Sequence, residues 1–377
     1  MSVALYNHPR LYRQDKAAID AAIARVIGSG RLDWGSEVPA FEAEFAAWNG
    51  AGHAVAVHSG TTALKSALLA LGVGPDDEVI TVPNTDIACS SAIRMVGAEI
   101  VWVDIDPASR TMNVAALAAA ITSRTKAIMP VDMFGQPADM AAIKAIAEGH
   151  GLAIVEDACL ALGAEIEGRK VGSFADITCF SFAPSKHLGS FGSGGCCLTE
   201  NADLAERLRM ISAYGQRRTR HYASGVNGLH HETDGLNERL DEVQAAILRA
   251  KLPGLAAALA ERRAQAGLYA DGLEGLGLDL PTSRPGTLHA WRNYVIETDG
   301  RDGLSVALGE NGIATSITYA PPMHLQPVYR GMNRGRGSYP IAERSCQRLL
   351  GLPIGPQITR TEIAEVIAGV RQAMASL

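Results

Sequence analysis

The sequence predicts a three-layer α/β domain with a largely parallel sheet, followed by a smaller C-terminal α+β domain. Short apolar runs alternate with helical patterns from residue 54 to 157, the texture changes after Gly235, and 377 residues are enough for two domains. Strands that alternate with helices indicate βαβ units, whose helices cover both faces of a parallel sheet. We therefore expect a large domain over residues 1–250, with an N-terminal arm at 1–15, and a small domain over 251–377.

The first half of the chain supplies the alternating elements in order. Strands are predicted at 54–57, 78–82, 100–103, 127–131 and 153–157, and helices at 61–71, 87–96 and 140–150. Two further apolar runs, 176–182 and 196–199, are typical of buried strands on either side of a glycine-rich loop.

The second half changes in character. A long helical stretch is predicted at 240–259, interrupted at Pro253-Gly254, and it continues over 262–273. Short strands at 292–296 and 316–319, a surface loop at 331–337 and a closing helix at 361–374 complete the expected small domain.

Composition excludes several classes of function. A net charge of −6 offers no basic field for nucleic acid, although Arg217, Arg218, Arg220 and His221 form a local cluster that suits an anionic substrate. Six cysteines without a CxxC pair indicate reduced, buried thiols rather than disulfides or a metal site. No secretory signal and no membrane-length apolar run are found, so we expect a cytoplasmic protein.

Lys186 is the strongest catalytic candidate. It follows the predicted strand 176–182 in the run Ser181-Phe182-Ala183-Pro184-Ser185-Lys186, and Gly192-Ser193-Gly194-Gly195 comes after it. Most lysines are solvated surface charges. Ligand chemistry in open α/β sheets gathers at strand ends, however, and an amine held there beside phosphate-binding donors is what a Schiff-base cofactor needs.

A candidate phosphate-binding cup, Ser59-Gly60-Thr61, lies between the predicted strand 54–57 and the helix 61–71. Small residues let the backbone approach an anion, and the start of a helix offers free N–H groups and the positive end of its dipole. The same pattern is also ordinary helix N-capping.

Asp157 ends the predicted strand 153–157. A buried carboxylate there needs a cation, and the protonated ring nitrogen of pyridoxal phosphate would serve; an N-cap for a following helix is an equally good explanation. Together, Lys186, Asp157 and the cup supply the amine, the ring-nitrogen partner and the phosphate cradle of pyridoxal 5'-phosphate, and Ser181 adds a phosphate donor.

Eight strings carry a family resemblance: 59–64 (SGTTAL), 72–80 (GVGPDDEVI), 103–106 (VDID), 135–140 (GQPADM), 156–158 (EDA), 181–186 (SFAPSK), 235–246 (GLNERLDEVQAA) and 324–327 (HLQP). In this order, and over almost the whole chain, they resemble the DegT/DnrJ/StrS family of pyridoxal-phosphate-dependent sugar aminotransferases. The resemblance implies a fold of the aspartate-aminotransferase type (fold type I) and a homodimer with active sites at the subunit interface.

The resemblance also implies roles for individual residues. Lys186 would form the internal aldimine and shuttle protons, and Asp157 would keep the ring nitrogen protonated. The phosphate ligands would be Ser59, Gly60, Thr61, Ser181 and Asn237, the last reaching the phosphate of the neighbouring subunit. Glutamate or glutamine would donate the amino group, and a keto-sugar, usually nucleotide-linked, or a keto-cyclitol would accept it.

Three positions depart from the family's pattern. Where members commonly stack an aromatic ring over the cofactor, this chain has Asp86, which either acts on the substrate or caps the helix at 87. The usual glutamine three residues beyond Asp157 is Leu160, which removes a hydrogen bond to the cofactor worth about 0.5–1.5 kcal/mol. The usual asparagine after the lysine is His187, a second proton-transfer group or a structural histidine.

These departures leave two alternatives to an aminotransferase. One is a pyridoxal-phosphate lyase or dehydratase on the same scaffold; the family's dehydratases replace the lysine by histidine, so Lys186 favours transamination. The other is a non-catalytic regulatory homologue, against which the retained Lys186, Asp157 and Asn237 argue. Candidate substrate residues are His187, Arg239, Tyr319 and His324.

Overall fold

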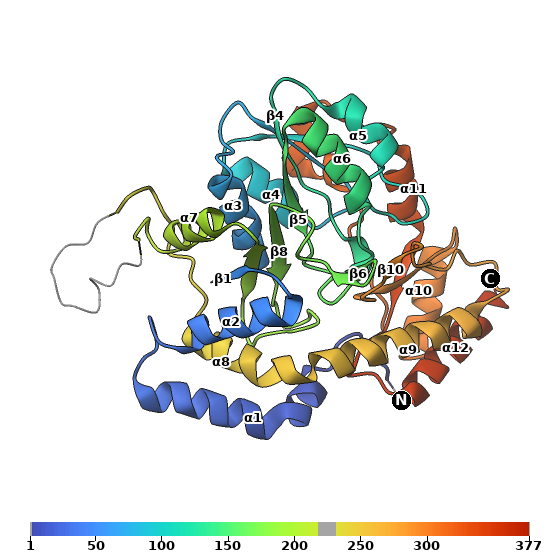
Figure 1. The fold of residues 1–377 in the computed structure, drawn as a ribbon. Coiled ribbons are helices and arrows are strands. Elements are labelled where there is room, and N and C mark those ends of the chain that lie inside the picture. Colours follow the sequence, from blue (N-terminus) through green and yellow to red (C-terminus); the bar gives the residue numbers. More distant parts are fainter. Residues whose placement is uncertain (1, 218–230, 377) are drawn as a thin grey trace.

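The structure is a computed structural model that describes residues 2–217 and 231–376. Seven strands form its central sheet: β1 (His53–Val57), β2 (Glu78–Thr81), β3 (Glu99–Trp102), β4 (Thr125–Ile128), β5 (Ala153–Asp157), β8 (Ile177–Ser181) and β9 (Gly195–Thr199). Their order is β1-β9-β8-β5-β4-β2-β3 (Figure 1). Only β9 runs antiparallel to its neighbours. The predicted, mostly parallel sheet is confirmed.

Helices cover both faces of this sheet. They are α2 (Glu37–Asn49), α3 (Gly60–Ala70), α4 (Ile87–Met95), α5 (Val114–Ala120), α6 (Met140–His150), α7 (Ala202–Ser212) and α8 (Glu242–Lys251), with a 3₁₀ turn η1 (Met133–Gly135). The first helix, α1 (His8–Ser29), packs outside them against α8. In β1, Val55 and Val57 pack with α3, α4 and α7, whereas Ala54 and Ala56 pack with α2 and α8. Successive side chains of a strand point to opposite faces, so the apolar runs serve two cores.

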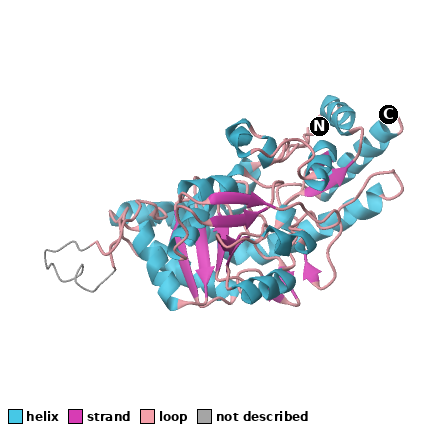
Figure 2. Cartoon of the chain, turned by 90° about the horizontal axis from the view of Figure 1, so that it is seen from above, coloured by secondary structure: helices cyan, strands magenta, loops and turns pink. Residues whose placement is uncertain are grey.

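The C-terminal part continues from α8 through η3 (Leu252–Gly254), α9 (Leu255–Leu273), β10 (Thr287–Leu288), β11 (Tyr294–Glu297), α10 (Arg301–Glu310), η4 (Met323–Leu325), η5 (Pro327–Met332), α11 (Pro340–Arg348), β12 (Leu349–Leu352) and α12 (Arg360–Met374). β11 and β12 pair antiparallel, and with α9, α10 and α12 they enclose a separate apolar cluster around Tyr269 and Tyr294. Figure 2 shows both chain ends grouped on this side of the molecule.

Three short strands form a further small sheet, in the order β10-β6-β7, where β6 is Glu165–Ile166 and β7 is Arg169–Lys170. We propose that the small domain begins near residue 251, because the separate apolar cluster draws almost all its residues from beyond that point. The segment from η4 to α11 nevertheless contributes Met323, Tyr329 and Tyr339 to the core of the large sheet.

Several expectations need correction. Residues 8–15 of the expected arm begin α1, and Val3 lies in the C-terminal apolar cluster and bridges to Ile313. The expected strand 316–319 is absent; Ser316 forms one bridge to Gly351. The expected loop 331–337 starts inside η5.

By length and composition alone, Glu242–Leu273 would suffice to cross a membrane, contrary to the sequence expectation. In the structure this stretch is three successive elements, α8, η3 and α9, broken at Pro253 as predicted. Its residues Leu248, Leu255 and Leu259 pack in the core shared with α2.

Candidate active site

Three parallel strands bring the predicted site residues to one edge of the central sheet. β1 and β8 both run antiparallel to β9, and β5 is parallel to β8, so their carboxyl ends coincide. Gly60 starts the helix after β1, Asp157 ends β5, and Ser181 ends β8. A Cβ on Gly60 would lie 2.7 Å from the Cβ of Ser181 and 3.1 Å from the Sγ of Cys159. Segments distant in sequence therefore touch here.

Lys186 lies in the loop after β8, where its backbone N–H donates to the Ala183 carbonyl at 2.8 Å. Burial lowers the pKa of its amine below the ordinary value of 10.5. Four neighbouring groups also act on this pKa: Cys159, Asp157 and Asp86 raise it, and Arg292 lowers it. A lowered pKa makes the neutral amine, which is the nucleophilic form, more accessible than in a free lysine.

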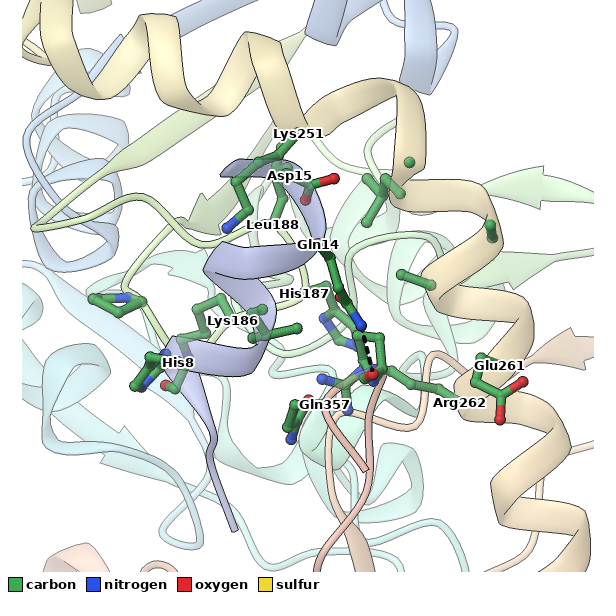
Figure 3. Close-up of a pocket in the computed structure, with 18 of the residues that line it drawn as sticks. His8, Gln14, Asp15, Lys186, His187, Leu188, Lys251, Glu261, Arg262 and Gln357 are labelled. Atoms are coloured by element: carbon green, nitrogen blue, oxygen red, sulfur yellow. Dashed lines mark hydrogen bonds between the residues drawn. The ribbon is translucent and has the colours of Figure 1, made fainter. Parts of the chain in front are cut away.

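A cavity of about 360 Å³ adjoins this lysine (Figure 3). It lies between α1, the start of α9 and the loop after β8, and Tyr6, His8, His187, Lys251 and Arg262 are among the residues that line it. The Lys251 ammonium donates to the Gly189 carbonyl, and burial lowers its pKa to about 8. The loop after β8, which carries Lys186, thus faces a cavity large enough for a small ligand.

Asp157 is a buried carboxylate with only 5% of its surface exposed. One oxygen accepts a hydrogen bond from the Cys159 amide at 3.0 Å, and the other accepts from the Cys89 thiol at 2.8 Å. Burial first, and Asp157 next, raise the pKa of Cys89, so this thiol stays protonated as a donor. Residues 158–164 form turns and no helix, which rules out the N-cap explanation of Asp157.

The predicted cup forms the start of α3. The Ser59 hydroxyl accepts from the Thr62 amide at 3.1 Å, so Ser59 is indeed an N-cap. Thr62 in turn donates to Glu238 at 2.9 Å. The first turn of a helix leaves its N–H groups without intrahelical acceptors, so the amides of Gly60 and Thr61 remain available to an anion. Capping and anion binding are compatible at this helix end.

The three departures have distinct surroundings. Asp86 caps α4, accepting from the Ala88 amide at 2.9 Å, and its side chain is exposed beside the site. Leu160 is buried in the large core. The His187 Nε2 hydrogen-bonds to the Ala290 carbonyl at 3.0 Å, and burial lowers the pKa of this imidazole well below 6.5. This arrangement favours the structural interpretation of His187.

The other candidate substrate residues do not all lie at this site. Tyr319 stacks on Phe134 with ring centroids 6.3 Å apart, and burial raises the pKa of its hydroxyl, with Asp86 contributing next. Tyr319 therefore lies at the same sheet edge as Lys186 and Asp157, which we call the strand-end site. His324 is 1% exposed and pairs with Glu343 at 3.0 Å, in contact with aromatic rings.

Arg239 lies at the start of α8, where it pairs with Asp33 at 2.9 Å and covers the Trp34 ring. Asn237 is exposed two residues earlier. In the basic cluster, Arg217 pairs with Glu232 at 3.1 Å, whereas Arg218, Arg220 and His221 lie outside the described residues.

Sequence reasoning missed three residues at this site: Cys89, Cys159 and Arg292. Cys89 faces β5 from α4, and Cys159 follows Asp157 by two residues. Arg292 is a charged residue that precedes the buried strand β11 by two positions. A cationic residue next to an apolar run was the available signal for it, but its partner in space is Tyr6, far away in the chain.

Comparisons with known proteins point to one family. The family model described as the DegT/DnrJ/EryC1/StrS aminotransferase family matches residues 13–371. The dTDP-3-amino-3,4,6-trideoxy-alpha-D-glucose transaminase of Streptomyces venezuelae is 44% identical over 362 residues, which cover 96% of this chain and 93% of that protein.

Two solved structures are also similar. The crystal structure of S. venezuelae DesV in complex with a ketimine intermediate superposes with a TM-score of 0.95 at 43% identity, covering 99% of this chain and 98% of that one. NtdA from Bacillus subtilis with bound cofactor PMP superposes with a TM-score of 0.91 at 28% identity, covering 99% of this chain and 85% of that one. The fold implied by the sequence resemblance is confirmed.

Proposed function

Because the chain belongs to the DegT/DnrJ/EryC1/StrS aminotransferase family, we propose that it transfers an amino group from glutamate or glutamine to a nucleotide-linked keto-sugar, with pyridoxal 5'-phosphate as cofactor. One observation carries this proposal beyond the family. The half-buried Lys186 and the buried carboxylate of Asp157 lie at the same sheet edge as the N-terminus of α3.

Pyridoxal phosphate fits the residues present. Asp157 offers a buried carboxylate to a protonated ring nitrogen, and the free amides of α3 with the Ser181 hydroxyl suit a phosphate. Gly60 leaves a cradle that a Cβ would fill, because that Cβ would meet Ser181 at 2.7 Å. When bound, the cofactor supplies an electron sink for the carbon that bears the transferred amine.

The protein's own residues then have defined tasks. Lys186 would hold the cofactor covalently and would move a proton at the carbon that gains or loses nitrogen. Asp157 keeps the ring nitrogen protonated, and Cys89 and Cys159 orient its two oxygens. His187, held by the Ala290 carbonyl, fixes the loop that carries the lysine.

The proposal includes a homodimer in the cytoplasm. Asn237 is exposed in the single chain, next to Glu238, which contacts Thr62 in the cup. An exposed amide at this place suits a role in the phosphate site of a second copy. All six cysteines are free, which suits a reducing compartment.

Two half-reactions test the proposal. Adding glutamate to the purified, cofactor-loaded protein should yield 2-oxoglutarate and convert the cofactor to its pyridoxamine form. The isolated pyridoxamine form, mixed with a panel of dTDP-linked, UDP-linked and free keto-sugars, should return to the starting absorbance only with its acceptor. A protein that reacts with no amino acid but eliminates water from a sugar would support the dehydratase alternative. A protein that never binds pyridoxal phosphate would support the regulatory one.

A further inference from the structure

Arg292 is a buried cation without a matching anion. Only 5% of its surface is exposed, and its Nε is buried without a hydrogen-bond partner. Its Nη2 donates to the Tyr6 hydroxyl at 3.2 Å, and its guanidinium lies 5.4 Å from the centre of that ring. Among residues 2–217 and 231–376, no carboxylate forms a salt bridge with it. Burying a charge in this way is costly unless an anion completes the site.

The protein treats its other buried arginines differently. Arg262 donates through Nη1 to three backbone carbonyls, those of Trp291, Arg292 and Ile354, at 3.2–3.5 Å. Arg110 pairs with Glu297 at 2.6 Å. Of the three buried arginines among the described residues, Arg110 and Arg262 thus have acceptors within the protein, whereas the Nε of Arg292 has none. A buried polar atom that lacks one needs another explanation, and a missing ligand is the simplest.

The position of Arg292 indicates which ligand. Its charge acts on three groups of the strand-end site: Lys186, His187 and Tyr319. Tyr6, its hydrogen-bond partner, also lines the cavity of about 360 Å³ beside Lys186. An anion held by Arg292 would therefore lie next to the amine at which nitrogen transfer takes place.

The proposed substrates carry the α-carboxylate of the amino donor, the γ-carboxylate of glutamate and the diphosphate of the keto-sugar, and their distances from the reacting atoms differ. In an amino acid donor, the α-carboxylate is bonded to the same carbon as the transferred amine, so it must lie beside the reacting groups. In a nucleotide-linked keto-sugar, ring atoms separate the diphosphate from the carbonyl that reacts. A guanidinium binds any of these anions, but the α-carboxylate is the one that must lie beside the lysine.

We propose that Arg292, supported by Tyr6, forms the subsite for the α-carboxylate of the amino donor. This inference rests on the proposed aminotransferase function and names a residue for one of its two substrates. Arg292 would orient the donor so that its amine, rather than its carboxylate, faces Lys186. The exposed carboxylate of Asp86, which also acts on Lys186, would repel a donor carboxylate placed near the amine.

The test compares Arg292→Gln and Arg292→Lys with the control Arg284→Gln. Arg284 also has a buried Nε without a partner, but it pairs with Asp139 at 2.7 Å. We expect Arg292→Gln to raise the glutamate concentration for half-maximal conversion about 10- to 100-fold, the range of a charge-assisted hydrogen bond. Arg292→Lys keeps the charge but lacks the planar guanidinium. Its half-saturating glutamate concentration should lie between those of the wild type and Arg292→Gln. Arg284→Gln should stay within about twofold of the wild type.

A binding measurement separates the subsite from catalysis. Glutarate carries carboxylates and no amine, so its dissociation constant, followed by the absorbance of the lysine-bound cofactor, reports the subsite alone. We expect it to weaken in Arg292→Gln by the same factor as glutamate, with cofactor content and circular dichroism unchanged. Inorganic pyrophosphate, the second probe, should bind all variants alike. Tyr6→Phe removes the supporting hydroxyl and should weaken glutarate by about two- to fivefold.

The outcomes are distinguishable. If the wild type converts glutamate and Arg292→Gln does so with unchanged half-saturation, the subsite is wrong and the aminotransferase stands. If pyrophosphate binding falls instead of glutarate binding, Arg292 serves the diphosphate and the donor assignment is overturned. If the wild type reacts with no amino acid, the proposed function fails, and loss of glutarate binding in Arg292→Gln still decides whether the carboxylate subsite exists.

Discussion

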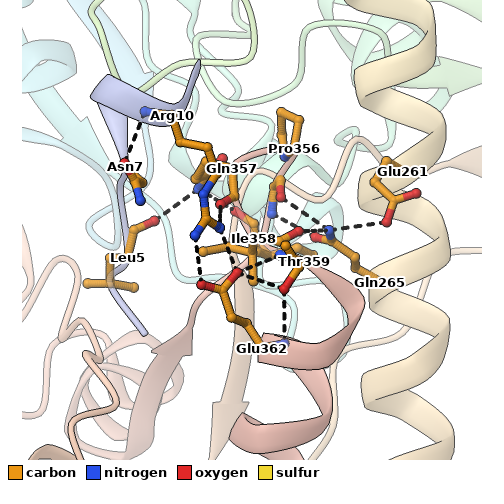
Figure 4. A network of polar contacts seen from close by, with 12 residues as sticks. Leu5, Asn7, Arg10, Glu261, Gln265, Pro356, Gln357, Ile358, Thr359 and Glu362 are labelled. Carbon is orange, nitrogen blue, oxygen red and sulfur yellow. Dashed lines mark hydrogen bonds and ion pairs between the residues drawn. The ribbon is translucent and has the colours of Figure 1, made fainter. Parts of the chain in front are cut away.

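Gln265, in the middle of α9, and Lys186, after β8, are both polar side chains enclosed by protein, but their surroundings differ. Gln265 donates to the carbonyls of Gly355 at 3.1 Å and Ile358 at 2.8 Å, and it accepts from the Gly355 amide at 2.8 Å. Figure 4 shows this network, which continues to Arg10 and Glu362. Near Lys186, by contrast, the buried Nε of Arg292 has no partner.

This contrast distinguishes polar groups that serve folding from those that await a ligand. Hydrogen bonds inside the C-terminal network are complete, so its members stabilise the packing of α9 against the segment before α12. The strand-end region keeps charges whose neighbours shift their pKa values, which is typical of functional sites. The comparison predicts that mutations in the two regions affect different measurable quantities.

The largest difference between the two regions should appear when Lys186→Ala is compared with Gln265→Ala. Lys186→Ala removes the amine that attaches the cofactor and moves the proton, so the glutamate half-reaction should fall by at least about 10³-fold. Stability should not fall, because burial disfavours this charged amine in the folded state.

Gln265→Ala should do the reverse. It leaves buried backbone groups of Gly355 and Ile358 unpaired and should cost about 1–3 kcal/mol of unfolding free energy, with unchanged turnover per folded molecule. Denaturant unfolding and single-turnover kinetics check both variants. A Gln265→Ala protein with native stability and lost activity would contradict the distinction.

Two buried glutamates give the next largest contrast, in their pH dependence. Burial raises the pKa of Glu156 from 4.5 to about 7, and its Oε1 has no partner. Burial also acts on Glu343, but donors from Gly337, Tyr339 and His324 outweigh it and lower that pKa. Glu156 therefore stabilises the fold at low pH, and this contribution is lost as pH rises from about 4.5 through about 7.

Glu343 has the opposite sign: its contribution is present above 4.5 and is lost as the pH falls below that value. We expect Glu156→Gln to flatten the decline in unfolding free energy between pH 4.5 and pH 7, a change on the order of 3 kcal/mol, which is the shift from 4.5 to about 7 at about 1.4 kcal/mol per unit. Glu343→Gln should destabilise most above pH 5 and leave that decline in place. Denaturant titrations at several pH values across this range test the prediction. If the unfolding free energies of the two variants depended on pH in the same way, the opposite signs assigned to Glu156 and Glu343 would be wrong.

The strands and the lysine were predictable because their signals are local. Polar residues end the apolar runs at β5 and β8 and follow the run at β1, and Lys186 and Asp157 were predicted from that pattern. Parallel strands then bring these ends together without further information. The family motifs supported the cofactor already inferred from Lys186, Asp157 and the cup, although Asp86, Leu160 and His187 depart from the family's pattern.

Other parts of the site depend on contacts between distant segments. An arginine before a short strand has the appearance of a surface residue, and its enclosure depends on distant segments such as the one that carries Tyr6. Cys89 was predictable as a residue in a helix, but not as the donor to Asp157, because that depends on how α4 lies over β5. The expected strand 316–319 failed because Tyr319 has φ +67°, outside the extended region.

Glycines in the two regions give a smaller and cleaner contrast. A Cβ at Gly60 would meet Ser181 and Cys159, whereas Gly267 in α9 has nothing within 4 Å of such an atom. Gly60→Ala should therefore weaken binding of pyridoxal phosphate by about 1–3 kcal/mol through overpacking of the cradle. Gly267→Ala should stabilise the fold by roughly 0.5–1 kcal/mol, because alanine is the better helix former, and leave cofactor affinity unchanged. Cofactor titration of both apoproteins, with thermal unfolding, tests the pair; equal cofactor affinity would refute the cradle.

The smallest effect should come from Cys89. Its thiol is a weak donor to Asp157, so Cys89→Ala should weaken cofactor binding by about 0.5–1.5 kcal/mol, and Cys89→Ser should restore most of the loss. Cys197 is the matched control: it is equally buried, but its thiol donates to the Ala63 carbonyl at 3.4 Å. Fluorescence titration gives the affinity, and a pH titration of cofactor absorbance shows whether the environment of Asp157 has changed. If serine and alanine behave alike at position 89, the thiol only fills space, and Asp157 is oriented by the Cys159 amide alone.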